Sequence, residues 1–372
     1  MEILISKSEL SSALSKVQGI VEKKNTVPIL SCVLFEVEGP NLFVSATDLE
    51  ISLRSKYQAE VSTEGAVTAP AKKIFEIVRE LPEGDVRITA GDGGWVHLEM
   101  GRARFKVMGL PKEDFPSVPQ IEGGEKLEFT PAELGEMIDK TSFAMSHDQT
   151  RHALNGILWE ISPAGDGQAE CRMIATDGHR LAYIKRVCQG EVTGKRVAIV
   201  PRKAIVEVKR LLGEGSGGKI EVFFQENRLT FRLGGSIMVT RLVEGQFPDY
   251  HQVIPEETGR KAIVNRENFY KAVRRIATLS SERAAPLKFQ FKKGGVTISA
   301  VNPEVGEATE DLEAEYQAEE MEIGLNARYI VEAFSTLDQE KVSLEMNEAL
   351  SPSLIRPIGD DDYRCVIMPM RL

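Results

Sequence analysis

Hydrophobic and polar positions along the chain follow two periods. Residues 71–81 place apolar side chains at the spacing of one helical face. Segments of this kind predict six helices, near residues 7–24, 70–81, 131–145, 201–212, 266–279 and 326–338. Between them, short runs of alternating apolar residues, as at 42–46, 104–108 and 296–300, predict antiparallel strands with one buried face. We therefore expect helices packed on antiparallel sheets, an α+β arrangement.

The same order of landmarks occurs three times, at intervals of about a third of the 372 residues. An apolar run, a polar turn and a helix start stand at 3–10, 127–134 and 262–269. Ser8 and Thr130 are the expected helix caps. Basic helix starts recur at 70–73, 201–203 and 326–328, and proline-flanked strands are expected at 115–119, 247–255 and 363–369.

These landmarks predict three tandem domains of similar plan, each with two copies of a smaller motif. We expect the domains to span residues 1–121, 122–253 and 254–372. The Gly- and Glu-rich segments 122–125 and 255–259 are the expected linkers.

Composition mainly excludes several classes of protein. The chain is 42% hydrophobic and 27% charged, which is typical of a globular protein. No apolar stretch reaches the ~18 residues of a membrane span, and the N-terminus does not resemble a secretory signal. The four cysteines are scattered, which disfavours disulfide scaffolds and zinc sites and fits a reducing cytoplasm.

Charge is distributed unevenly. The chain carries a formal charge of −10, yet the six predicted helices together carry a positive charge. If these helices face one cavity, that cavity would attract a polyanion inside an acidic protein. The alternative is that Lys and Arg simply favour solvated helix surfaces, and both interpretations stay open on charge alone.

Motifs of common catalytic sites are missing. There is no Gly-x-Gly-x-x-Gly after a strand, no Walker A loop and no His-Glu-x-x-His. The Gly-rich segment 90–95 lies between strand-like runs and predicts a hairpin turn. We expect no catalytic residue, no metal ion and no cofactor.

One catalytic alternative has to be weighed. Asp177, His179, His147 and Cys171 could form the metal site of a hydrolase, although their spacing supports it poorly. The other interpretation is a tight turn, because residues 47–50 hold a similar Thr-Asp pair in the equivalent place of the first domain.

The C-terminal segment 365–372 is apolar to its last residue. Its Met-Pro-Met sequence could pack in the core or line an adaptable apolar groove.

Several segments resemble, in order and from end to end, the bacterial DNA polymerase III β subunit family of sliding clamps. The resemblance is carried by residues 26–30, 46–50, 154–156, 175–182, 200–203, 246–250, 321–324 and 366–372. It implies a head-to-tail homodimer that closes a ring around double-stranded DNA, with helices lining the hole. Implied partners are the replicative polymerase α subunit, the clamp loader δ subunit, and other polymerases, ligase and mismatch-repair proteins that carry clamp-binding peptides. No membrane contact is implied.

The resemblance also implies three sets of site residues. A partner-peptide pocket would involve Arg151, Leu154, Thr176, Gly178, His179, Arg180, Leu181, Pro248, Val253, Leu350, Val366, Met368, Pro369, Met370 and Leu372. Met and Leu side chains would form its floor, and Arg151 with the 176–181 turn its polar rim. Gln252 and Ala284 stand where the family has a basic and an aromatic residue, so partner preference is expected to differ in detail.

The DNA-facing candidates are Lys24, Lys72, Arg79, His147, Gln149, Lys203, Lys209, Arg210, Lys271, Arg274 and Arg275. Asp148 weakens the assignment of the 147–149 loop because it is acidic. The dimer-interface candidates are Lys73, Phe105, Val107, Leu279, Glu304, Glu307 and Glu310. The alternative for Phe105 is a core position in its own domain.

Besides the clamp, two functions remain open: the metal-dependent hydrolase using His179 and Asp177, and a monomeric scaffold that binds polyanions. A clamp predicts a dimer of about twice the 41.2 kDa chain mass and no turnover. A scaffold predicts a monomer.

Overall fold

The computed structural model describes residues 1–21, 27–119, 123–213, 218–279 and 286–372. They form two compact units. The first contains 1–132, 189–191 and 206–242, and the second contains 133–188, 192–205 and 243–372. The central repeat contributes to both units. Within the described ranges, no helix combines the length and apolar character that a membrane crossing requires.

All six predicted helices are confirmed. They are α1 (Lys7–Val17), α2 (Ala71–Glu80), α3 (Pro131–Ser142), α4 (Arg202–Gly213), α5 (Arg266–Ile276) and α6 (Ala327–Ser335). The first was predicted too long: α1 ends at Val17, just before Gly19, a residue type that commonly follows a helix end. Its cap is Ser6, whose side chain accepts from the Glu9 amide, so the assignment of Ser8 was wrong.

Each repeat contains two copies of a β-α-β-β-β motif, as expected. The first repeat contains β1 (Glu2–Ser6), β2 (Cys32–Glu38), β3 (Asn41–Thr47), β4 (Ile51–Gln58), β5 (Glu60–Thr63), β6 (Gly65–Pro70), β7 (Asp85–Ala90), β8 (Trp95–Met100) and β9 (Ala103–Met108). Strand β5 lies between the two motifs of this repeat and belongs to neither of them. The Gly-rich segment forms the turn between antiparallel β7 and β8, which confirms that prediction.

The central repeat contains β10 (Glu125–Phe129), β11 (Gly156–Gly165), β12 (Gln168–Thr176), β13 (Arg180–Gln189), β14 (Arg196–Pro201), β15 (Ile220–Phe224), β16 (Arg228–Leu233) and β17 (Ser236–Arg241). The third contains β18 (Arg260–Asn265), β19 (Pro286–Lys292), β20 (Gly295–Asn302), β21 (Gly306–Glu313), β22 (Met321–Asn326), β23 (Lys341–Met346), β24 (Ser353–Pro357) and β25 (Tyr363–Ile367).

Of the three proline-flanked strands, only the last, β25, is present. Residues 115–119 form no strand, and 247–255 contain a short 3-10 helix, η5 (Tyr250–Gln252). The prolines explain the difference, since they lack the backbone donor that a strand ladder needs.

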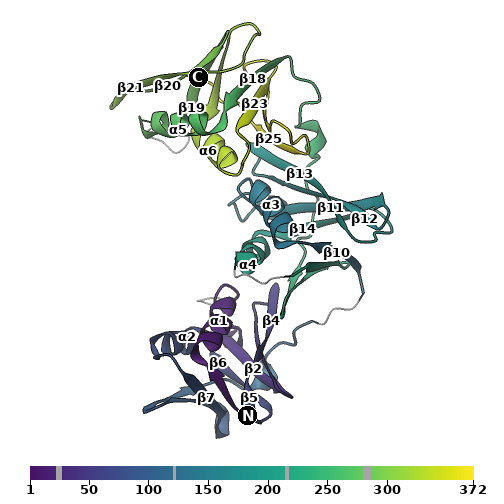
Figure 1. The fold of residues 1–372 in the computed structure, drawn as a ribbon, viewed down its shortest axis with the longest axis vertical. Coiled ribbons are helices and arrows are strands. Elements are labelled where there is room, and N and C mark those ends of the chain that lie inside the picture. The colour runs from purple at the N-terminus through teal and green to yellow at the C-terminus, as the bar shows by residue number, and fades with distance from the viewer. Residues whose placement is uncertain (22–26, 120–122, 214–217, 280–285) are drawn as a thin grey trace. The chain divides into compact units, whose positions relative to one another are not determined.

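The first unit contains two sheets and the helix pair α1 and α2. One sheet has the order β5-β1-β7-β8-β9, and the other runs β10-β15-β16-β17-β4-β3-β2-β6. Helices α1 and α2 lie side by side over strands β2, β3, β4 and β6 (Figure 1). Leu10, Leu14, Ile74 and Val78 are fully buried there, so the predicted apolar helix stripes form this core.

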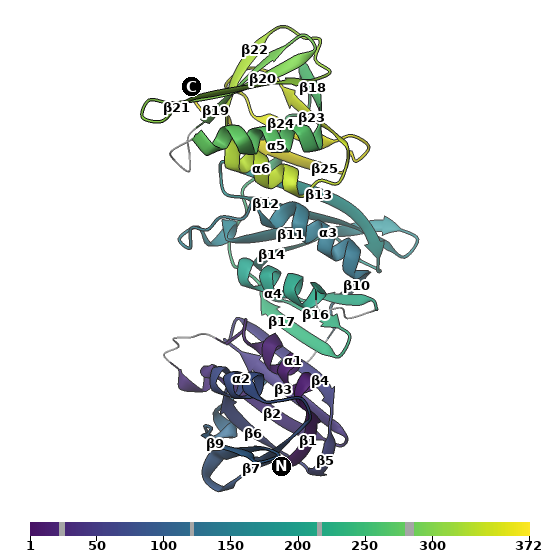
Figure 2. The same ribbon diagram turned by 60° about the vertical axis from the view of Figure 1, so that its left-hand side comes forward.

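The second unit repeats this arrangement. Strands β18-β23-β24-β25-β13 continue into β12, β11 and β14, and a four-stranded sheet has the order β21-β20-β19-β22. Helices α5 and α6 pack side by side (Figure 2). The rings of Phe269, Phe289 and Phe334 stack between these helices and β19.

Two edge-to-edge strand pairs join successive repeats. In the first unit β17 pairs antiparallel with β4, and in the second β25 pairs antiparallel with β13. In both cases the last strand of one repeat pairs with the strand that ends the first β-α-β-β-β motif of the preceding repeat. In the described part of the chain, the corresponding strands β9 and β21 each end a sheet and have only one neighbour.

Candidate functional site

A buried apolar cluster in the second unit forms the floor of the candidate pocket. Leu181 on β13 and Val366 on β25 are directly paired, and both side chains are buried in this cluster. Val253 packs against it while partly exposed. The other buried members are Leu158, Ile174, Ile199, Tyr250, Ile254 and Leu354. Three predicted pocket residues are therefore brought together on one apolar floor.

The sequence reasoning missed the aromatic part of this floor. Tyr183 and Phe247 pack on the cluster, and the Tyr183 and Tyr250 ring centroids are 6.0 Å apart. The Tyr250 hydroxyl donates to Glu160 over 3.0 Å, and burial raises the pKa of Tyr250, so it remains a protonated donor. The available signal is the segment 247–255, which the sequence pattern predicts to be a strand.

A tight turn between β12 and β13 forms one edge of the pocket. The Asp177 carboxylate accepts from the amides of His179 and Arg180, at 2.9 and 3.1 Å. Thr176 donates to the Arg180 carbonyl and accepts from the Gly178 amide. Gly178 has φ +88°, a conformation that favours glycine. The turn leaves Gly178 and His179 exposed and confirms its structural interpretation.

Arg180 was expected on the polar rim, but its side chain is only 2% exposed. Its guanidinium bonds to Asp177 over 3.1 Å, to the Phe143 carbonyl over 2.6 Å and to Glu332 on α6. It also lies 4.4 Å from the Tyr329 ring centroid. Arg180 therefore holds the turn against α6 instead of facing a ligand. Sequence alone could not reveal this burial.

The C-terminal segment forms the opposite edge. The Met368 amide donates to the His179 carbonyl over 2.9 Å, and the Met370 amide to the Gly324 carbonyl over 2.8 Å. Residues 365–367 are buried, whereas Met368 is 36% and Leu372 64% exposed. Residues 365–367 therefore pack in the core, whereas Met368 and Leu372 are accessible and can line an apolar groove.

The remaining pocket candidates lie at or near the surface. Pro248 and Leu350 are exposed, while Leu154, Pro369 and Met370 are partly buried. Arg151 is exposed and donates to the Asp177 carbonyl over 3.3 Å, which places it beside the turn as expected. Gln252 donates to Asp249, and Ala284 lies outside the described residues. The arrangement offers an apolar floor with exposed Met, Leu and Pro side chains, which suits a peptide with apolar anchors.

The residues of the hydrolase hypothesis are not arranged as a metal site. Asp177 is engaged by the turn and by Arg180, and Cys171 is fully buried. The parts of the chain that the structure describes hold no cluster of three or more metal-binding side chains.

Most of the eleven DNA candidates lie on helices, and at least five of them have an acidic neighbour among the residues that the structure describes. Lys72 lies 3.9 Å from Glu76, Arg79 3.4 Å from Glu80 and Lys271 2.9 Å from Glu267. Lys209 and Arg274 are exposed and Lys203 is partly buried. Lys24 lies outside the described residues.

Three other DNA candidates are engaged within the protein. Arg210 bonds to Glu207 over 2.9 Å and to the Lys16 carbonyl, and Arg275 is paired with Glu310. His147 contacts Arg202 at 3.1 Å, and that positive charge lowers the pKa of His147. Gln149 is exposed next to it.

Most of the dimer candidates lie on or near the edge strands β9 and β21, and one, Lys73, lies on α2. Phe105 on β9 is 37% exposed, so the alternative of a core position is wrong. Val107 is partly buried, and Glu307 and Glu310 lie on β21. Glu304 is exposed just before β21, and the Leu279 carbonyl accepts from Asn302 over 3.1 Å. Lys73 is exposed on α2 and pairs with Glu76.

Three α+β repeats with two β-α-β-β-β motifs each, together with an apolar cluster that has exposed side chains at its margin, define the class of DNA-clamp proteins. Family models of the DNA polymerase III beta subunit match all three parts of the chain. The N-terminal domain matches residues 1–119, the central domain 128–249 and the C-terminal domain 251–371.

Similar proteins agree over the full length. The beta sliding clamps of Caulobacter vibrioides and Pseudomonas putida are 35% and 34% identical, with complete coverage of both chains. A Caulobacter crescentus beta sliding clamp structure matches with a TM-score of 0.94 at 35% identity, covering 100% of both chains. A Bartonella birtlesii sliding clamp bound to griselimycin matches with a TM-score of 0.94 at 34% identity, also with 100% coverage of both.

The chain therefore belongs to the DNA polymerase III beta subunit family, the beta sliding clamps. This confirms the resemblance, the fold class and the interpretation as a non-catalytic replication subunit. The hydrolase alternative has no support.

Proposed function

We propose that two copies of this chain close a ring around duplex DNA and tether DNA-processing enzymes to it. The observation that supports this proposal most directly is that strands at sheet edges pair between successive repeats. Two junctions between repeats are already made by edge strands, β17 with β4 and β25 with β13. The corresponding edges β9 and β21 remain for a second copy.

The two free edges are complementary in charge. Strand β9 carries Arg104 and Lys106, whereas β21 carries Glu307, Glu310 and Asp311. Exposed strand edges are open to pairing with another chain. A head-to-tail contact between β9 of one copy and β21 of the other, made twice, closes a two-fold ring. The domain boundaries after residues 121 and 253 are part of this proposal.

Basic side chains on the helices support a role in enclosing DNA. Lys72, Arg79, Lys271 and Arg274 are exposed on α2 and α5 in a chain of charge −10. Their acidic neighbours leave only a moderate positive field, which suits loose phosphate contacts without base readout. Such contacts would let the ring slide.

The pocket on the second unit supplies the tether. We infer that it binds short peptides with apolar anchors from the polymerase α subunit, the clamp loader δ subunit and other replication and repair enzymes. The apolar floor with exposed Met368 and Leu372 supports this role. As a bacterial replication protein the chain would act in the cytoplasm.

The ring is tested by DNA topology. The protein is loaded onto nicked circular DNA with a bacterial clamp loader and ATP, the circle is cut, and bound protein is followed by gel filtration. Retention on circles and release on cutting is the expected result. Equal retention on both forms, or a monomer mass near 41.2 kDa in sedimentation, would favour the polyanion-binding scaffold instead.

A further inference from the structure

Two turns in different repeats share one hydrogen-bond pattern. In the first repeat, the Asp48 carboxylate accepts from the amides of Glu50 and Ile51, at 2.9 and 2.6 Å. Thr47 donates to the Ile51 carbonyl and accepts from the Leu49 amide. Asp177 and Thr176 make the same four bonds at the candidate pocket.

The strands that follow these turns also correspond. Strand β4 pairs with β17 in the first unit, as β13 pairs with β25 in the second. The Arg241 amide donates to the Glu50 carbonyl over 2.9 Å, as the Met368 amide donates to the His179 carbonyl over 2.9 Å. The junction of the first and central repeats therefore has the backbone architecture of the candidate peptide pocket.

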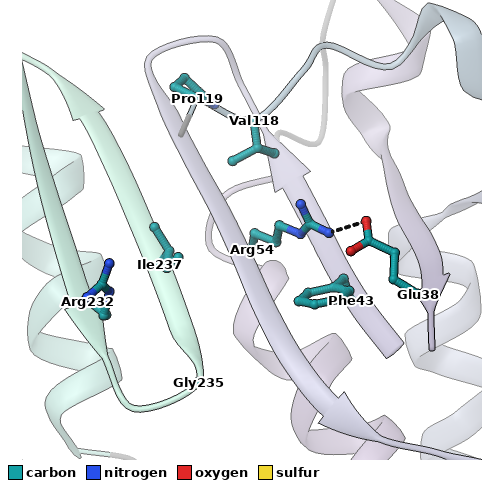
Figure 3. Close-up of a pocket in the computed structure, with 8 residues that line it drawn as sticks. All are labelled: Glu38, Phe43, Arg54, Val118, Pro119, Arg232, Gly235 and Ile237. Carbon is teal, nitrogen blue, oxygen red and sulfur yellow. Dashed lines mark hydrogen bonds and ion pairs between the residues drawn. The ribbon is translucent and has the colours of Figure 1, made fainter. Parts of the chain in front are cut away.

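This junction has a cavity of its own, of about 320 Å³, close to the lower end of the size range of ligand pockets. Figure 3 shows Phe43 and Arg54 on one side, Ile237 and Arg232 on the other, and Val118 and Pro119 above. All of these residues belong to the first unit. The cavity can hold one or two side chains of a peptide.

The walls of the cavity carry two guanidinium groups. The Arg54 guanidinium stacks over Phe43, 4.0 Å from the ring centroid, and one of its terminal nitrogens lies 2.9 Å from a Glu38 oxygen and 3.0 Å from a Glu36 oxygen. A second terminal nitrogen points toward Val118 (Figure 3). Arg232 bonds through one nitrogen to Glu221 over 2.7 Å. Because Glu38 is 58% and Glu36 34% exposed, water screens both ion pairs, and a ligand carboxylate can compete for Arg54.

Leu49 provides a second observation at this junction. It has φ +76° and is 52% exposed, an uncommon conformation for a branched residue, where the pocket turn has Gly178. An exposed apolar side chain is thus held at one end of β4. Arg54, which lines the cavity, is three residues beyond the first residue of β4, roughly 10 Å along the strand at ~3.3 Å per residue.

We propose that the β4–β17 junction is a second peptide-docking site, which takes a short extended segment with an apolar side chain next to a carboxylate. The apolar side chain fills the cavity between Phe43, Val118 and Ile237, and the carboxylate bonds to Arg54 and Arg232. The proposal extends the proposed clamp function, because a tethered enzyme would then contact each chain at two places.

The test separates the two sites by variants. A fluorescein-labelled Gly-Leu-Asp-Phe-Gly peptide is titrated into the full chain and into a chain ending at Pro369, which lacks part of the C-terminal pocket. We expect two peptides per full chain and one per shortened chain. In the shortened chain, Arg232→Glu should weaken the remaining binding at least tenfold, and a peptide with Asn in place of Asp should bind at least tenfold more weakly.

The matched control is Arg228→Glu, which lies on the same face of β16 but does not line the cavity. It should leave peptide affinity within twofold, and circular dichroism establishes that each variant folds. No binding to the shortened chain, with one peptide on the full chain, would overturn the second site and leave the proposed clamp function intact. Equal effects of the two Glu variants would overturn it as well. No binding to either chain would contradict both sites, while the DNA-topology test would still report on the ring.

Discussion

At the residue scale, buried arginines hold the second unit together around its candidate pocket. Arg180 bridges Asp177 and Glu332, and Arg186 bridges Glu136 and Asp360, with Lys140 as the fourth charge of this second network. Each bridge connects the central repeat to the third repeat. Because these charges are largely removed from water, they contribute mainly as complete sets, and the loss of one member leaves its partners unpaired.

Arg180→Ala should therefore destabilise the second unit by about 3–5 kcal/mol, since two carboxylates lose their buried partner. Urea unfolding followed by fluorescence of the buried Trp159, in a Trp95→Phe background, measures this loss. The exposed Arg151→Ala serves as the control and should change the free energy of unfolding by less than about 0.5 kcal/mol. Equal effects of the two variants would show that Arg180 does not hold the turn.

The Glu136 and Asp360 carboxyls should make stability depend on pH. Burial alone would raise the pKa of both groups, but hydrogen bonds from Arg186 and Lys140 outweigh it and lower the pKa below the usual 4.5 and 3.8. The stability from these groups is thus fully present above their usual pKa values. It is lost as the pH falls through the lower folded-state values.

A Glu136→Gln/Asp360→Asn variant should lose part of this dependence. Its free energy of unfolding should rise less steeply between pH 3 and 5, by up to ~1.4 kcal/mol per pH unit for each carboxyl removed. Urea unfolding at several pH values measures the slope, with exposed Glu244→Gln as the control. An unchanged slope in the double variant would mean that the network does not govern acid stability.

At the scale of elements, the sequence predicted the helices and repeats, which depend on local periodicity. It missed the features that depend on which distant segments bury a side chain. Helical spacing located all six helices, and the recurring landmarks located the repeats. Ser6 rather than Ser8 caps α1, because the helix begins at Lys7 and Ser8 already lies inside its first turn. The proline-flanked segment 247–255 was predicted to be a strand, whereas it contains a short 3-10 helix that places Tyr250 in the pocket floor.

The misplaced Arg180 has the same origin as the missed Tyr183 and Tyr250. A linear pattern shows that a residue is polar or aromatic, but not which distant segment covers it. Glu332 lies far along the chain from Arg180, and no motif indicates that the two pair. The resemblance located the turn correctly, and only the folded chain shows which of its side chains point inward.

The free edge strands lead to a prediction about assembly. Phe105→Arg should weaken dimer formation at least tenfold, because a charged side chain replaces an exposed aromatic on the β9 edge. Sedimentation equilibrium measures the dissociation constant. Val197→Arg on β14 is the matched control, since Val197 is also exposed on a strand and is absent from the proposed interface. A dimer that both variants leave intact would exclude β9 from the interface.

At the scale of the whole molecule, the charge distribution favours a protein that encloses DNA in a ring over one that binds DNA directly through its surface. A chain of charge −10 is repelled by DNA over most of its surface, so direct phosphate binding should be weak. Retention then has to come from topology, which does not depend on salt. Electrostatic contacts, in contrast, weaken steeply as counterions are added.

The salt dependence of DNA retention should therefore distinguish enclosure in a ring from electrostatic binding to phosphates. Protein loaded on nicked circles should keep its half-life within about twofold between ~0.1 and ~0.5 M NaCl, whereas unloaded protein should lose its binding to linear DNA over the same range. Lys271→Glu/Arg274→Glu should slow loading, because the helix surface then repels phosphate, yet leave the half-life on circles unchanged. A half-life on circles that falls at least tenfold with salt would mean that phosphate contacts, and not a closed ring, hold the protein on DNA.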